Sequence, residues 1–167
     1  MASVKQWSVG YARQAEVDFQ TFQRIQASSI PSCHKLQFLQ MACEKLVKSH
    51  LCGEGIDPRS LQTSHAYVAK YLPIVLREQP LFKTYGVGKA KEVTTHARHL
   101  AREIDVLAPA VKRGGLRPDN CEYPWEDAGG VLRVPVDWTF HPSRLMEAPA
   151  GRTILKLIRG AIDRLVI

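Results

Sequence analysis

Hydrophobic residues recur at helical spacing in five segments of the chain. The cleanest pattern lies in residues 89–107, where Val93, Ala97, Leu100 and Ile104 are three or four positions apart. A one-sided stripe of this kind is typical of helices that bury one face against their neighbours. The other segments are residues 5–27, 34–51, 63–76 and 152–167. The pattern predicts an all-α fold, an antiparallel four- or five-helix bundle.

Local signals indicate where these helices should begin or bend. Pro31 predicts a turn after the first helix, and Ser32 is expected to cap the second. Pro73 lies inside the third segment, which it should kink or break because proline cannot donate a backbone hydrogen bond. The residues predicted to share one core are Leu36, Leu39, Cys43, Leu46, Val93, Ala97, Leu100, Ile104, Ile158 and Leu165.

Residues 108–150 differ in character from the helical segments. They are rich in proline and form an irregular insertion, which we expect to fold as an ordered flap. Alternation from Leu132 to Phe140 predicts a half-buried edge strand, and Trp125 could pair with it across the Gly129–Gly130 turn as a short β-hairpin. Trp125, Trp138 and Phe140 are expected to cover the bundle. The alternative is a platform on which nucleic-acid bases stack.

Length and composition favour one domain. The chain has 167 residues and 45% hydrophobic content, enough for a single core over residues 1–167. No apolar run reaches the ~20 residues that a membrane-spanning helix needs, and the N-terminal residues become charged too early for a secretory signal. The four cysteines form no C-x-x-C pair. Two disulfides are an alternative, but reduced thiols and a cytoplasmic location are the prediction.

Positive charge is concentrated in the third quarter of the chain. The net charge is +7, and residues 81–117 carry eight basic side chains against three acidic ones. Such a concentration can attract phosphates through counterion release. The alternative is a solvated basic face without a partner. The residues predicted to contact the phosphates of a nucleic acid such as RNA are Lys89, Lys91, Arg98, Arg102, Lys112 and Arg113.

The helix predicted at residues 34–51 carries ordered charge on its polar side. Glu44 and Lys48 are one turn apart, acid before base, as in a favourable exposed pair. The run from Ala42 to Ser49, ACEKLVKS, resembles the core helix of HEPN (higher eukaryotes and prokaryotes nucleotide-binding) domains. The resemblance implies a helical domain concerned with RNA or nucleotides, in a toxin–antitoxin or antiphage defence setting, and a homodimer.

Other segments are similar to the same family. Asp18 and Phe19 lie in a first helix like that of HEPN domains, and residues 63–67 resemble the start of a later family helix. Tyr123-Pro124 resembles the end of a family R-Y-P motif, although Glu122 stands where Arg is expected. The similarity extends over most of residues 8–167.

Ribonucleases of that family use an R-x(4–6)-H motif, and Arg59 and His65 match its spacing. The resemblance implies a metal-independent endoribonuclease without a cofactor. Arg59 would hold the phosphate, and His65 would move the proton of the attacking 2′-hydroxyl. Because the permitted spacing is loose, the alternative is that His65 is an ordinary residue at a helix start.

A second set of residues lies beside the predicted core face of residues 89–107: Glu92, His96, His99 and Glu103. A di-metal bundle site would need Glu-x-x-His sets on other helices, and the predicted helices contain none. We therefore predict no metal site. The competing functions are a noncatalytic adaptor or antitoxin-like subunit that binds a protein partner through residues 108–150, and a nucleotide-binding bundle.

Overall fold

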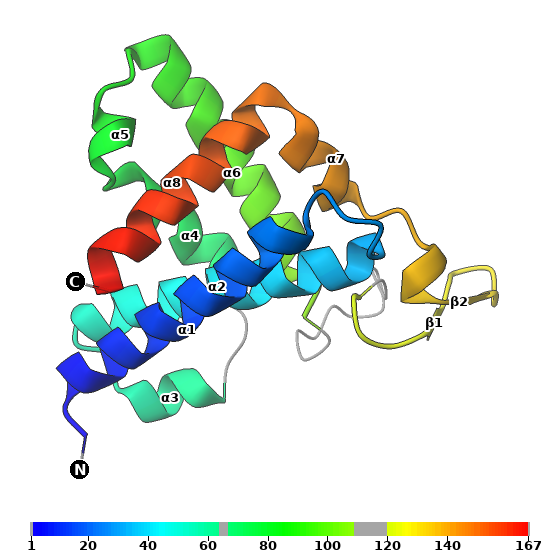
Figure 1. The fold of residues 1–167 in the computed structure, drawn as a ribbon, viewed down its shortest axis with the longest axis horizontal. Coiled ribbons are helices and arrows are strands. Elements are labelled where there is room, and N and C mark those ends of the chain that lie inside the picture. The colour runs from blue at the N-terminus through cyan, green and yellow to red at the C-terminus, as the bar shows by residue number, and fades with distance from the viewer. Residues whose placement is uncertain (1, 64–66, 109–119, 167) are drawn as a thin grey trace.

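The computed structural model describes residues 2–63, 67–108 and 120–166 and confirms the all-α bundle (Figure 1). Helix α1 packs along α2, α4 packs along α6, and α8 contacts both pairs. Because α8 joins the two pairs, all five long helices share one interior. They are α1 (Val4–Ile25), α2 (Ser32–Gly53), α4 (Val68–Arg77), α6 (Val87–Asp105) and α8 (Pro149–Val166).

The predicted core is confirmed for nine of its ten residues, which are almost fully buried. Leu165 lies near the end of α8 and is only partly buried against the same cluster. At the other end of the chain, Ser3 and Gln6 form a reciprocal capping box: each side chain bonds the other's backbone N–H. This cap fixes the start of α1.

Three short helices were not expected from the sequence: α3 (Pro58–Gln62), α5 (Pro80–Lys83) and α7 (His141–Glu147). Each has proline in its first turn, where the missing N–H costs nothing and the fixed φ favours a helix. They are too short to show a helical hydrophobic period.

Two expectations about helix geometry, a break at Pro73 and a side-chain cap by Ser32, were wrong. Helix α4 is not broken at Pro73 but continues through it to Arg77. Helix α2 already includes Ser32, and Pro31 is its N-cap without a side-chain hydrogen bond. The Ser32 hydroxyl instead donates to the carbonyl oxygen of Trp138, 3.4 Å away, and so connects α2 to the insertion.

The described part of the insertion, residues 120–150, contains the predicted short hairpin. Strand β1 (Trp125–Glu126) pairs antiparallel with β2 (Leu132–Arg133) at one end of the bundle (Figure 1). The longer half-buried strand was wrong: Leu132 is 69% exposed, and Pro135 begins a 3₁₀ turn, Pro135–Asp137, which ends the extended backbone.

The aromatic residues of the insertion cover the bundle, as expected. Trp125 and Phe140 belong to the hydrophobic core, and Trp138 packs against it. The rings of Trp125 and Trp138 meet edge to face with centroids 5.5 Å apart. These rings are therefore used for packing.

All four cysteines are buried free thiols. Burial raises the pKa of the Cys43 thiol to about 12, so this group is an inert part of the core. In the part of the chain that the structure describes, none of the helices has the length and apolar character required to span a membrane.

Candidate functional site

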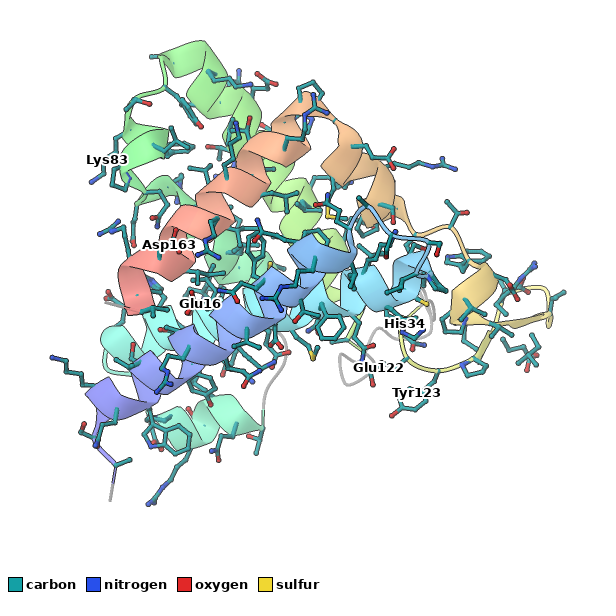
Figure 2. The ribbon with its side chains drawn as sticks, in the orientation of Figure 1. Glu16, His34, Lys83, Glu122, Tyr123 and Asp163 are labelled. Atoms are coloured by element: carbon teal, nitrogen blue, oxygen red, sulfur yellow. The ribbon has the colours of Figure 1, made fainter. Side chains whose placement is uncertain are left out.

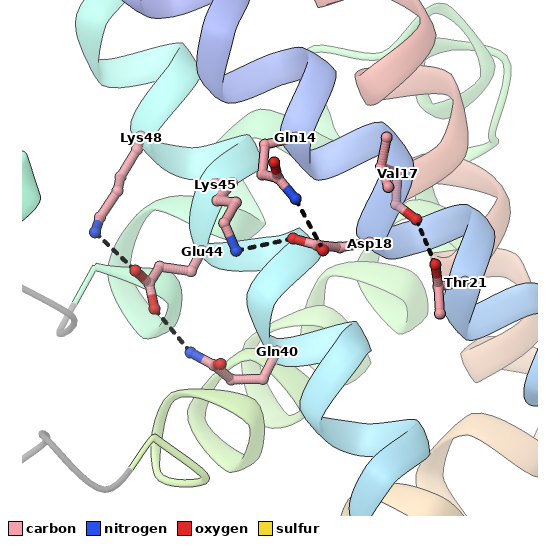
Figure 3. Close-up of polar contacts among 8 residues, drawn as sticks. All are labelled: Gln14, Val17, Asp18, Thr21, Gln40, Glu44, Lys45 and Lys48. Carbon is pink, nitrogen blue, oxygen red and sulfur yellow. Dashed lines mark hydrogen bonds and ion pairs between the residues drawn. The ribbon is translucent and has the colours of Figure 1, made fainter.

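The motif helix α2 carries a buried polar ladder (Figure 3). Glu44 accepts a hydrogen bond from Gln40 Nε2 at 2.9 Å and one from Lys48 Nζ at 2.7 Å. The Lys48 and Glu44 side chains are only 4% and 11% exposed, so the expectation of an exposed pair was wrong. The helical period places Glu44 and Lys48 one turn apart, but neighbouring elements decide whether that face meets water.

Other polar side chains join α2 to α1. Lys45 Nζ lies 2.8 Å from the Asp18 carboxylate, which also accepts a bond from Gln14 (Figure 3). Nearer the N-terminus of α1, Ser8 and Ser49 each donate a hydroxyl hydrogen bond to the other's carbonyl oxygen. The residues that carry the family resemblance therefore stabilise the helix pair.

Tyr11 lies beside the same interface. Burial raises the pKa of its phenol, and the nearby Cys52 and Glu44 raise that pKa further. The ladder and the pairs with α1 show that the polar side chains of α2 are used in contacts within the fold.

Arg59 lies in the first turn of α3, where Asp57 caps the helix by accepting from the Arg59 N–H. The Arg59 side chain is exposed and lines a surface pocket of about 550 Å³ together with Trp7 of α1. A guanidinium and an indole that line one pocket suit a phosphate and a base. His65 lies outside the described residues, so its pairing with Arg59 remains a prediction.

Helix α6 separates the predicted RNA-binding residues into two groups. Lys91, Arg98 and Arg102 are exposed and lie on one stripe, because seven and eleven residues are close to two and three helical turns. Lys89 lies elsewhere on the helix and pairs with Glu92 at 3.1 Å. Lys112 and Arg113 lie outside the described residues.

The residues labelled in Figure 2 lie outside helix α6. Lys83 is exposed at the outer edge of α5, and Glu122 and Tyr123 point into solvent beside the hairpin (Figure 2). Asp163 of α8 and Glu16 of α1 both pair with Arg159, at 2.9 and 3.8 Å (Figure 2). We refer below to Lys91, Arg98 and Arg102 as the α6 basic stripe.

The acidic and histidine residues of α6 fall into two groups, one with contacts within the helix and one that faces α7. His96 Nδ1 lies 3.1 Å from the backbone oxygen of Glu92, a contact within the helix. His99 and Glu103, in contrast, face His141 at the start of α7. His141 was not predicted from the sequence, because it lies 38 positions beyond Glu103 and no spacing rule connects the two residues. The nearest signal was the Phe140–Pro142 context, which suggests a helix start.

No family profile matches the chain, and searches of curated proteins and of solved structures found no relative. The HEPN resemblance therefore rests on the sequence motifs alone.

Proposed function

We propose that the chain is an RNA-binding module of HEPN type that holds a single strand along the α6 basic stripe. One observation carries this proposal: Lys91, Arg98 and Arg102 are exposed on the side of α6 opposite the buried Val93 and Leu100. The core does not require this arrangement, since any polar residue would serve on the solvent side.

The dimensions of the stripe suit a polyanion. Eleven residues of helix separate Lys91 from Arg102, a rise of ~16 Å. Successive phosphates of one strand in a duplex are ~3.4 Å apart along the axis, so the stripe spans several of them. The three cations contact the backbone rather than base edges, and binding should therefore depend little on sequence.

The test is the salt dependence of binding to a fluorescent single-stranded RNA. Three phosphate contacts predict a decrease of about 2 log units in affinity per log unit of salt, and the pair Arg98→Glu and Arg102→Glu should reduce this slope by about 1.4. At physiological salt the same pair should weaken binding at least about tenfold. An RNA affinity that changes neither with salt concentration nor with the charge reversal would refute the proposal.

A matched control separates the stripe from net charge. Arg13 and Arg24 are exposed on α1, and changing both to Glu lowers the net charge from +7 to +3, as the stripe variant does. We expect the α1 variant to retain the wild-type salt slope. Circular dichroism of both variants should match the wild type, because all four positions are exposed.

Cleavage is the second part of the proposal and rests on the family resemblance. If Arg59 and His65 form a ribonuclease site, products should carry 2′,3′-cyclic phosphates and cleavage should persist in EDTA. His65→Ala should then lose cleavage and keep binding. Salt-sensitive binding without cleavage would leave a noncatalytic RNA-binding module.

Assembly is a further element of the proposal. A twofold homodimer would bring two copies of Arg59 near one axis, as a composite site requires. Light scattering should then give twice the 18.7 kDa mass of the chain at micromolar concentration. A monomer that enters a larger heteromeric complex through the described residues 120–150 would instead favour the adaptor function.

A further inference from the structure

We propose that His99, Glu103 and His141 form a binding site for one divalent transition metal ion of the zinc type. Each residue offers one ligand atom, and the three atoms lie within 4.8 Å of one another. Two come from α6 and one from α7. This inference is independent of RNA binding, since it uses none of the residues of the α6 basic stripe.

The distances fit a tetrahedral ion with little rearrangement. Zinc lies ~2.1 Å from nitrogen and oxygen ligands, so two ligands of a tetrahedral site are ~3.4 Å apart. His141 Nδ1 and Glu103 Oε2 are already separated by 3.3 Å. The His99 ring centroid lies 5.1 Å from that of His141, and the rings are tilted by 57° rather than stacked. A rotation of the His99 side chain would therefore bring its ligand atom to the ion.

The backbone fixes the three positions. His99 and Glu103 are one helical turn apart on the same side of α6, an arrangement that lets two side chains reach one point. His141 is the first residue of α7, between the buried residues Phe140 and Pro142, which hold the backbone there. The site therefore does not depend on an exposed loop for its shape.

The donor set selects the type of metal. Two imidazoles and one carboxylate suit zinc and its first-row neighbours, whereas magnesium and calcium prefer oxygen ligands only. The Glu103 side chain is 11% exposed and forms the floor, and the His141 side chain is 45% exposed. Three protein ligands that open to solvent leave the fourth position for water or an exchangeable ligand.

Metal binding would connect the insertion to the bundle. Glu103 and His99 belong to the long helix α6, whereas His141 belongs to α7, which continues into α8 after Ala148. An ion at this point would add ligand bonds between two elements that already meet through side-chain packing and the His141–Glu103 contact. It should therefore raise the melting temperature of the folded protein.

The experiment measures zinc affinity of the purified, tag-free full chain, stripped with EDTA and dialysed, by competition with a chromogenic chelator. We expect one zinc ion per chain, a rise in melting temperature with zinc, and no such rise with magnesium. His99→Asn and His141→Asn should each weaken zinc binding by more than the ~10–100-fold typical of losing an outer-sphere partner. Cobalt should give the visible absorption bands of a tetrahedral site, and both variants should abolish them.

His96→Asn is the matched control, because His96 lies on α6 one turn before His99 and its ring bonds within the helix. This variant should bind zinc as the wild type does. Both tested ligands are exposed, so their substitution leaves the core intact, and circular dichroism checks this. Three results would each overturn the proposed site. They are no zinc binding by the wild type, zinc binding that survives both ligand substitutions, and an equal loss of zinc binding in His96→Asn. The cluster would then be a close contact between His141 and Glu103 without a bound metal.

Discussion

Lys48 donates a 2.7 Å hydrogen bond to Glu44 from a position where its own side chain is 4% exposed. The attraction between two buried opposite charges offsets the cost of removing them from water only while both are present. The pair therefore makes the fold depend on two residues of the motif helix that a sequence pattern places on the solvent side.

Lys48→Ala should lower the free energy of unfolding by about 3 kcal/mol, the lower end of the range for breaking a buried pair, because Gln40 still donates to Glu44. Urea denaturation measures the loss. Lys89→Ala is the control: its pair with Glu92 is exposed, and its removal should cost at most about 1 kcal/mol. Equal losses in the two variants would contradict the burial of the Lys48–Glu44 pair.

Gly151 lies where α8 passes close to α7. A methyl group added there would lie 2.7 Å from Met146 Cα and closer still to the Leu145 carbonyl oxygen, both of which are backbone atoms that cannot yield. Gly151→Ala should therefore destabilise the protein by about 1–3 kcal/mol, as an overpacked site does. Thermal and urea unfolding measure this.

Gly160 provides the comparison on the same helix. A methyl group there meets no atom within 4 Å, so Gly160→Ala should raise the free energy of unfolding by roughly 0.5–1 kcal/mol through helix propensity. A similar effect of the two alanines would show that α7 and α8 are farther apart than the structure places them.

The hydrophobic period predicted the five long helices because each buries one continuous face, and a buried face leaves a regular pattern. Leu100 and Ile104 were placed correctly for this reason. The pattern could not predict α3 or α7, whose few residues contain less than two full helical periods. Their signal was local, a proline in the first turn.

The candidate sites were less predictable than the fold. The α6 basic stripe follows from helical spacing, since one helix determines it alone. The burial of Glu44 and the approach of His141 to Glu103 depend on how separate elements pack. Such tertiary contacts leave no regular spacing in a single sequence, and for that reason the sequence analysis assigned Glu44 to the surface and omitted His141.

Leu100, in the second half of α6, is 1% exposed, and Leu100→Ala should cost ~2–5 kcal/mol through lost burial and the cavity left behind. Leu132 of the hairpin is 69% exposed, so Leu132→Ala should change the stability by less than about 0.5 kcal/mol. The midpoints of urea unfolding compare them directly. A large loss at Leu132 would mean that the hairpin packs against another surface in solution.

Asp127 holds the turn of the hairpin and should make it sensitive to acid. Its carboxylate accepts hydrogen bonds from the Val131 and Gly129 N–H groups and lies 2.6 Å from Arg133 Nη2. These partners, the Val131 N–H first and the Arg133 side chain next, hold the pKa of Asp127 below its ordinary value of 3.8. Gly130, at φ +76°, closes the same turn.

The lowered pKa determines how the stabilisation from Asp127 depends on pH. A carboxyl group that binds its proton less tightly when folded contributes its full stabilisation above pH 3.8 and loses it as the pH falls through the lower, folded value. In NMR, the Gly129 and Val131 amide signals should therefore shift together with a midpoint below 3.8. At neutral pH, Asp127→Ala should speed hydrogen exchange at both amides, whereas Asp137→Ala, in the following 3₁₀ turn, should not. A midpoint at or above 3.8 would show that the carboxylate is not held by these bonds.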